Sequence, residues 1–322
     1  DRFTIRNLEL IHSPHENAKT LIDVIDDTIS PMGSRMLKRW IALPLKDIQP
    51  IEERLNVVTE FIKNEKSAQL LKVSLERIGD LERLISRAAV GRISPREVGQ
   101  LNRALSEIGP IKELCSATTN EALKKIGEQL NPCATIQERI QRELVVEPPV
   151  ALSKGDVIAA GVNAELDELR ELKKNGKDSL LKIQQRESEA TGISSLKIAF
   201  NNVFGYYIEV RNAQKDKVPE TWHRKQTLVS AERYITEELK EYESKILGAE
   251  EKIAALESRL YNDLILALAD YISTIQLNAN LLARLDCLLA FSRIAIKHNY
   301  TKPQIDESKA LELPFGAPIF KW

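Results

Sequence analysis

Apolar residues after Ser230 recur at an unbroken spacing of four and then three residues. The repeat lasts for about four heptads and comprises Ile235, Leu239, Tyr242, Ile246, Ala249, Ile253, Leu256 and Leu260. A 3.5-residue period of this length is typical of a long helix that packs along one partner helix rather than into a globular core. The sequence therefore predicts a long helix that is capped by Ser230, carries Glu232 in its first turn and runs to about Ile275.

The expected partner helix lies upstream, between Val162 and Glu189. Gly176 lies in its middle and predicts a local weak point, because glycine costs a helix about 1 kcal/mol relative to alanine. The apolar residues of this segment lie along one side of the helix, with charges elsewhere: Leu166, Leu169, Leu172, Leu180 and Ile183. We expect the two helices to run antiparallel.

Residues 191–230, between the two helices, have the pattern of short strands. Apolar and polar residues alternate over 196–201 and 206–211 around a short turn, which favours a hairpin, and 227–229 favours a further strand. A rise of about 1.5 Å per residue over roughly 30 residues would place this β tip about 45 Å from the rest of the chain. The predicted fold class is mainly α: a discontinuous helical lever domain with two long antiparallel helices and a small inserted β-sheet at their tip.

The remaining residues mostly show helical patterns. Ser30 followed by Pro31 predicts a helix start, and Ser94, Pro95 and Glu97 predict a capping box. Residues 4–10 alternate weakly and favour an edge strand, while the prolines at 148 and 149 predict a connector. The predicted organisation is a first helical part (1–155), an outgoing helix (156–190), the β insertion (191–230), a returning helix with the rest of the helical part (231–308), and a tail (309–322).

Composition sets limits on the protein class. With 322 residues and 43% hydrophobic residues, the chain can bury about two cores, and its net charge of −1 gives no global footprint for nucleic acid or membrane. Residues 191–230 alone carry +3, which leaves −4 for the rest. Cys115, Cys133 and Cys287 are too far apart for a zinc ribbon, and we expect small buried side chains in a reducing compartment. Neither a leader peptide nor a membrane span is expected.

No catalytic constellation is expected. Asn175 to Ser179 superficially resembles a phosphate-binding loop, but Glu171 stands where that loop needs its first glycine, and no strand precedes it. The four histidines lack the spacing of metal ligands. The sequence therefore predicts no enzyme activity, cofactor or metal site in this chain.

The tip carries the one concentrated polar surface. Arg224, Lys225, Gln226 and Thr227 precede Ser230, and cations, hydroxyls and free N–H groups at a helix N-terminus suit phosphate oxygens. Lys197, Asn201 and Asn202 at the hairpin extend the same predicted surface. The alternative is an ordinary solvent-exposed β unit. The aromatic residues leave a similar choice between stacking on bases and forming a miniature core: Phe200, Phe204, Tyr206, Tyr207 and Trp222.

Five stretches together resemble the bacterial DNA mismatch repair proteins of the MutS family, in their core (lever) and clamp domains. The similarity covers residues 1–308, so we expect residues 309–322 to be a tail foreign to the family, either disordered or added. The stretches are SPMGSRMLKRW (30–40), GDLERLISR (79–87), EPPVALSKGDVIAAGVNAELDELR (147–170), FNNVFGYYIEV (200–210) and QTLVSAERYITEELKEYESKILGAEE (226–251).

The resemblance implies that this chain is a fragment whose β insertion is a clamp. Such a clamp grips the duplex DNA backbone without sequence preference, and the segment 224–230 corresponds to its contacting residues; Val229 stands where relatives carry more polar or basic side chains. The parent protein is expected to be a cytoplasmic, nucleoid-associated homodimer that uses ATP and magnesium and works with a MutL-type partner. A structural coiled-coil adaptor with a protein-binding β tip is the alternative.

Overall fold

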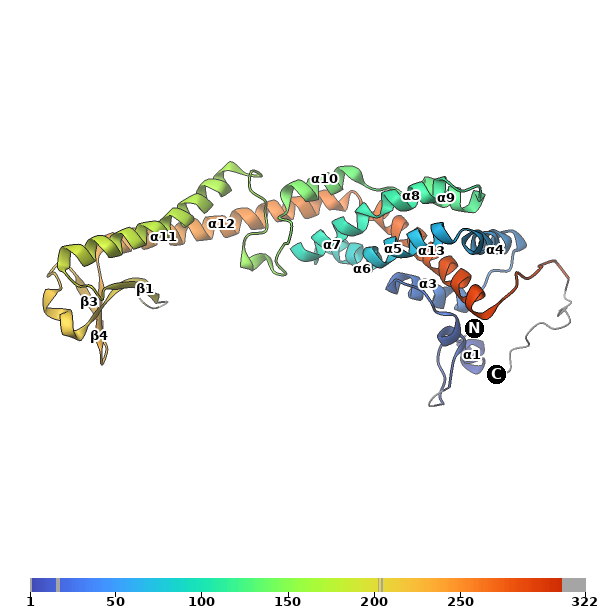
Figure 1. Cartoon of the computed structure of the whole chain (residues 1–322), viewed down its shortest axis with the longest axis horizontal. Coiled ribbons are helices and arrows are strands. Elements are labelled where there is room, and N and C mark those ends of the chain that lie inside the picture. Colours follow the sequence, from blue (N-terminus) through green and yellow to red (C-terminus); the bar gives the residue numbers. More distant parts are fainter. Residues whose placement is uncertain (1, 16–17, 202, 204, 309–322) are drawn as a thin grey trace. The chain divides into compact units, whose positions relative to one another are not determined.

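A computed structural model describes residues 2–15, 18–201, 203 and 205–308. Most of these residues are helical, and they contain one antiparallel sheet, which confirms the predicted mainly α class (Figure 1). In chain order the elements are α1 (Arg2–Asn7), α2 (Leu21–Ile25), α3 (Pro31–Ala42), α4 (Ile48–Lys63), α5 (Glu65–Ile78), α6 (Leu81–Ala89), α7 (Pro95–Ser106), α8 (Ile108–Ser116), α9 (Glu121–Gln129), α10 (Ala134–Glu143), η1 (Leu152–Lys154), α11 (Ala164–Thr191), β1 (Lys197–Asn201), β2 (Gly205–Arg211), η2 (Asn212–Lys217), β3 (His223–Thr227), β4 (Ala231–Ile235), α12 (Glu237–Ala269) and α13 (Ile272–His298).

The chain forms two compact units. Unit 1 comprises residues 1–93, 100–138 and 267–322, and unit 2 comprises residues 94–99 and 139–266. The tail 309–322, Asn202 and Phe204 lie outside the described residues.

Unit 1 is organised around α13, which is buried over most of residues 278–290 and packs against α3, α4 and α6. Ser30 caps α3 by accepting a hydrogen bond from the Gly33 amide at 3.0 Å, as predicted. Asp286 of α13 is fully buried beneath this cap and accepts hydrogen bonds from the amides of Ile29 (2.9 Å) and Ser30 (2.8 Å). Gly33 allows this approach, because a Cβ there would collide with the Asp286 carboxylate.

Two further predictions for the helical part had different outcomes. Ser94 and Glu97 form the predicted capping box at the start of α7. Residues 4–10 do not form an edge strand; Arg2–Asn7 is helical. The weak alternation had no strand to pair with, because the sheet of the described residues draws all its strands from 197–235. The three cysteines are free and buried, as expected.

Helices α11 and α12 of unit 2 run antiparallel, as predicted. Three ion pairs join them, and the position on α12 falls as that on α11 rises: Arg170–Glu257, Lys173–Glu250 and Arg186–Glu238. On α12 the heptad residues are buried or half-buried. On α11 the predicted stripe is buried only at its ends, by Leu166 and Ile183, whereas Leu172 in the middle is 46% exposed.

The connector before α11 belongs to unit 2. Leu144 and Ile158 form an antiparallel bridge, and the Val157 amide donates to Glu257 of α12 at 3.2 Å. The predicted boundary at 155 therefore falls inside a compact unit, whose edges lie at 138/139 and 266/267. The two prolines at 148 and 149 interrupt the helix without separating two bodies.

The sheet has the strand order β1-β2-β4-β3, with every neighbouring pair antiparallel. The predicted hairpin is confirmed as β1 and β2, with Phe200 opposite Tyr206 and Lys197 opposite Glu209. One face packs against α11 and α12 in a core that contains Ile183, Ile193, Leu196, Ile208, Val210, Trp222, Tyr234 and Leu239. The outer face carries the polar residues Lys197, Glu209, Gln226 and Arg233.

Candidate nucleic-acid interface

The predicted helix start at Ser230 is wrong. Ser230 lies in the turn between β3 and β4, α12 begins at Glu237, and the Leu239 amide donates to the Thr236 hydroxyl at 3.2 Å. Residues 231–235 form a strand because they pair with both β2 and β3, and this tertiary pairing overrides the helical period. Glu232, expected in the first turn of α12, lies in β4. The N–H groups of α12 are therefore not part of the predicted surface.

Arg224 and Glu232 form an ion pair at one edge of the core face. Arg224 Nη1 lies 3.4 Å from Glu232 Oε1, and the hydroxyl of Tyr234 donates to the same carboxylate. The hydrogen bond from Tyr234 lowers the pKa of Glu232, and Arg224 acts in the same direction. Burial and the bond to Glu232 raise the pKa of Tyr234 to about 12. The charge of Arg224 is thus partly neutralised within the sheet.

A row of polar side chains crosses the outer face of the sheet. Arg233 Nε donates to Glu209 at 3.1 Å, and Arg233 Nη1 donates to Gln226 Oε1 at 2.8 Å. The guanidinium also lies 4.5 Å from the ring centroid of Tyr207. Gln226, a predicted site residue, is therefore held in place by Arg233, with its amide oxygen already occupied.

The two predicted groups lie at opposite edges of the sheet. Lys197 and Asn201 belong to β1, whereas residues 224–227 belong to β3, so that β2 and β4 separate them by about 14 Å, three strand spacings. The side-chain oxygen of Asn201 accepts from the Val203 amide at 2.8 Å and shapes the hairpin turn. Lys197 is exposed on the same face as Gln226.

Several exposed cations of the sheet and of η2 lack carboxylate partners, unlike Arg224. Lys225 lies at a β-bulge of β3, Arg211 is the last residue of β2, and Lys215 lies in η2; among the described residues no carboxylate lies within ion-pair distance of these three or of Lys197. Arg211 and Lys215 were counted in the charge of the segment but were not selected as site residues. The signal that would have selected them is their position at and just after the end of β2, where Arg211 pairs with Ala231 beside the β3–β4 turn.

The β3–β4 turn is held by Asn212, which the sequence did not single out. Its side-chain nitrogen donates to the Val229 carbonyl at 2.9 Å, and its backbone amide donates to the Ser230 carbonyl at 3.1 Å. Thr227, Val229 and Ser230 are exposed at this turn, and the Val229 side chain makes no packing contact that buries it.

Most of the described aromatic residues are buried or half-buried in the sheet unit: Trp222 and Tyr206 pack on its core face, whereas Tyr207 lies beneath Arg233 on the outer face. Tyr207 and Trp222 are buried, and Tyr206 packs edge-on against Phe200 and Tyr242 with centroid distances of 5.0 and 5.5 Å. Phe200 alone among the predicted set within the described residues is largely exposed, at 48%. The miniature-core interpretation therefore holds for the rings on the core face.

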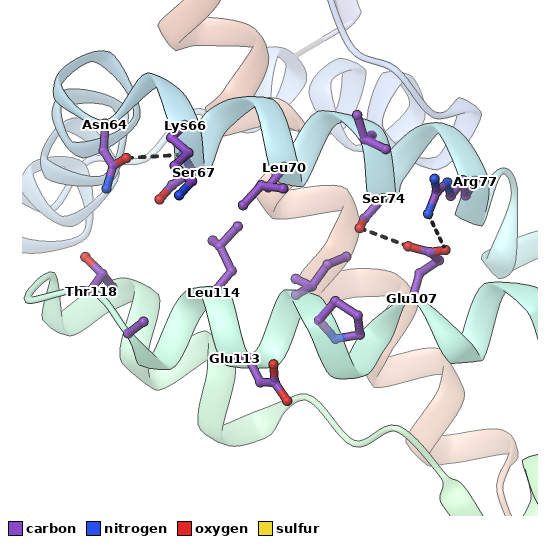
Figure 2. A pocket seen from close by; sticks show the side chains of 14 residues that line it. Asn64, Lys66, Ser67, Leu70, Ser74, Arg77, Glu107, Glu113, Leu114 and Thr118 are labelled. Atoms are coloured by element: carbon purple, nitrogen blue, oxygen red, sulfur yellow. Dashed lines mark hydrogen bonds and ion pairs between the residues drawn. The ribbon is translucent and has the colours of Figure 1, made fainter.

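A groove of about 750 Å³ lies between α5 and α8, with Leu70 and Leu114 extending toward each other across it (Figure 2). Three of its polar side chains bond to one another, since the Ser74 hydroxyl and Arg77 both donate to the Glu107 carboxylate, at 3.0 and 3.4 Å (Figure 2).

The structure also bears on the nucleotide, metal and membrane interpretations. Residues 175–179 lie inside α11, where no phosphate-binding loop can form. In the described part of the chain, no cluster of potential metal ligands is present. Across those same residues, no helix is long and apolar enough to cross a membrane.

Comparison with known families identifies the chain. The model of MutS domain III matches residues 3–292. The chain belongs to the MutS family. It is 60% identical over 316 residues to the DNA mismatch repair proteins MutS of Parabacteroides distasonis and Phocaeicola vulgatus, and 58% identical to that of Bacteroides fragilis. These matches cover 98% of the chain and 36 to 37% of each relative.

Membership of the MutS family confirms the resemblance seen in the sequence. The chain corresponds to domain III of a mismatch repair protein and spans just over a third of the length of the relatives. Because the matches leave out only a few residues, they reach beyond residue 308. The segment 309–322 as a whole is therefore not foreign to the family.

Proposed function

We propose that the sheet of unit 2 is a DNA clamp that grips the sugar-phosphate backbone of a duplex without reading its sequence. The observation that carries this proposal is a group of exposed cations of the sheet and of η2 that have no carboxylate within ion-pair distance among the described residues; it includes Lys197, Arg211, Lys215 and Lys225. Phosphate contacts need positive charge and hydrogen-bond donors, and they supply affinity rather than specificity. Thr227 and Ser230 at the ordered turn add hydroxyl donors.

A salt titration of the chain tests this proposal. A labelled 30-base-pair duplex is titrated by fluorescence anisotropy between 50 and 200 mM KCl. Three phosphate contacts give a slope of about −2.7 when the logarithm of the association constant is plotted against the logarithm of the salt concentration. The affinity should therefore fall about 40-fold between 50 and 200 mM KCl. Binding that does not change with salt would exclude the mechanism.

Two lysine variants separate the sheet from the general charge of the chain. Lys225→Ala is expected to weaken matched and mismatched duplexes equally and to reduce the slope by about one. Lys63→Ala removes an exposed lysine of α4, in unit 1, that has no carboxylate partner among the described residues, and should leave both slope and affinity unchanged. Loss confined to mismatched DNA would contradict backbone binding.

We further infer that α11 and α12 couple this clamp to an ATPase elsewhere in the parent protein. A helix of 33 residues is about 50 Å long, so a rotation of about 5° at one end of α12 moves the other end by about 4 Å. Closure around a duplex, ATP and magnesium binding, homodimer formation and a MutL-type partner belong to this proposal, as does a cytoplasmic, nucleoid-associated location.

This chain itself is proposed to be the arms and clamp rather than the enzyme, and an ATPase assay on it should read blank. The alternative, a coiled-coil adaptor, would show capture of a protein partner that survives nuclease treatment together with no salt-dependent duplex binding.

A further inference from the structure

A second group of cations lies in unit 1. A cavity of about 310 Å³ opens between α4, α9 and α13. Its polar wall is formed by Arg54, Arg284, Lys125 and Gln129, and its apolar wall includes Val57 and Leu288. Two of these residues, Arg54 and Arg284, stand 230 positions apart in the sequence and meet only in the fold.

The charges of this cavity are not balanced. Glu53 is the single carboxylate of the wall, and its oxygen lies 3.7 Å from the Lys125 ammonium. Neither Arg54 nor Arg284 has an ion pair or side-chain hydrogen bond with another residue of the described ranges, and both are half-buried. Two arginines thus line one small cavity whose single carboxylate, Glu53, is paired with Lys125.

The guanidinium of Arg54 stacks on an aromatic ring, which fixes its position. Its guanidinium carbon lies 3.5 Å from the ring centroid of Trp40, and Trp40 in turn packs on Phe291 at 6.3 Å. Burial and the neighbouring Arg284 lower the pKa of Arg54. Arginine stays charged in proteins, so this repulsion is relieved by an anion rather than by loss of a proton.

We propose that the cavity between Arg54 and Arg284 binds a small oxyanion, a phosphate or a carboxylate group. A guanidinium offers paired N–H donors that match two oxygens of such a group, and the apolar wall strengthens the interaction by excluding water. The volume lies at the lower end of small-molecule sites, which fits a single anionic group. The site is independent of the proposed clamp.

Thermal unfolding of the full chain tests the proposal with inorganic phosphate and with acetate as probes. Each is titrated at constant ionic strength adjusted with KCl. At ten times its Kd the bound anion is expected to raise the Tm of unit 1 by about 3 to 6 °C. An effect of phosphate alone points to a phosphate-bearing ligand, and an effect of both points to a carboxylate such as an acidic side chain of another segment. No effect beyond that of KCl overturns the proposal.

Charge reversal at Arg284 gives a result that a purely structural role would not. Arg284→Glu places a carboxylate opposite Arg54, so the variant is expected to be more stable than the wild type without anion and to lose the anion-dependent shift. Arg284→Gln keeps the fold with one charge fewer and should weaken anion binding at least tenfold. Arg103→Glu is the matched control, because Arg103 is exposed on α7 and does not line the cavity.

Two outcomes contradict the site. One is an anion shift that persists unchanged in Arg284→Gln. The other is an Arg284→Glu variant that folds but is destabilised to the same extent with and without phosphate. Duplex binding at the sheet should be the same in all these variants, which keeps this test separate from that of the clamp.

Discussion

The buried ion pair between α11 and α12 is expected to stabilise unit 2 far more than the exposed pair beside it. Glu257 is 1% exposed and accepts hydrogen bonds from Arg170 Nη2 at 2.5 Å and from the Val157 amide at 3.2 Å. Arg170 also donates to the Ile158 carbonyl at 2.8 Å. This network joins both long helices to the connector.

Replacing Glu257 with alanine removes the acceptor of both the Val157 amide and the Arg170 guanidinium. The positive charge of Arg170 is then left with no carboxylate at hydrogen-bond distance. Breaking a buried pair from one side costs about 3 to 5 kcal/mol. In this variant Arg170 still donates to the Ile158 carbonyl, and its side chain is 22% exposed to solvent. We therefore expect the lower end of this range, a loss of about 3 kcal/mol in the free energy of unfolding for Glu257→Ala. The double variant Arg170→Met/Glu257→Leu has no charge left to desolvate and should be more stable than Glu257→Ala, but about 1 to 2 kcal/mol less stable than the wild type, because the buried Val157 amide has lost its acceptor.

A double-mutant cycle in urea, followed by circular dichroism, measures the coupling. We expect about 2 kcal/mol or more for Arg170 with Glu257. The control is Lys173 with Glu250 on the same two helices, where the side chains are 47% and 43% exposed; its coupling should stay below about 0.5 kcal/mol. Equal couplings for the two pairs, or a Glu257→Ala variant within 1 kcal/mol of the wild type, would refute the reasoning.

Three further outcomes follow from the sheet. Tyr234→Phe should lower the free energy of unfolding by about 1 kcal/mol at pH 7. Because Tyr234 lowers the pKa of Glu232, the variant should also lose less stability than the wild type when the pH falls below about 4.5. Urea titrations at pH 7 and at pH 3.5 measure both effects. Gly205→Ala should destabilise the hairpin by about 1 to 2 kcal/mol in urea unfolding, since Gly205 has φ +75° and the added Cβ would push the Glu243 carboxylate away from the Tyr206 amide; a neutral result would contradict this. Asn212→Ala should lower duplex affinity about two- to fivefold in anisotropy titrations without changing the salt slope, because Asn212 orders the β3–β4 turn and contributes no charge. A slope that changes by one would instead indicate that Asn212 contacts a phosphate.

The sequence was most informative where one periodic pattern ran without interruption. The heptad of α12 predicted both the helix and its buried side, and alternation predicted the pairing of β1 with β2, because each pattern repeats the geometry of its own element. The pattern was misleading at Ser230. Residues 231–235 continue into the heptad through Ile235, and only the pairing of β4 with two neighbouring strands made them a strand.

Charged contacts between distant residues were beyond the reach of the sequence. Nothing in the segment 224–227 indicates that Arg224 is paired with Glu232 or that Gln226 is held by Arg233, since these contacts depend on strand register. Charge counting selected the segment, whereas exposure and pairing in the structure decide which of its cations remain available. Arg54 and Arg284 met only when α4 packed on α13.

The distribution of contacts along α11 predicts where this helix bends. Arg170 and Arg186 form ion pairs with α12 near the two ends of α11, whereas residues 171–175 between them are exposed and contact α12 through the exposed pair Lys173–Glu250. Gly176 follows this stretch within the helix. Gly176→Ala should therefore stabilise α11 by about 1 kcal/mol, measured as slower hydrogen exchange at the neighbouring amides. Ser179→Ala, in the same exposed part of the helix, is the control and should slow hydrogen exchange less. Equal slowing of exchange in the two variants would mean that Gly176 is not the weak point of α11.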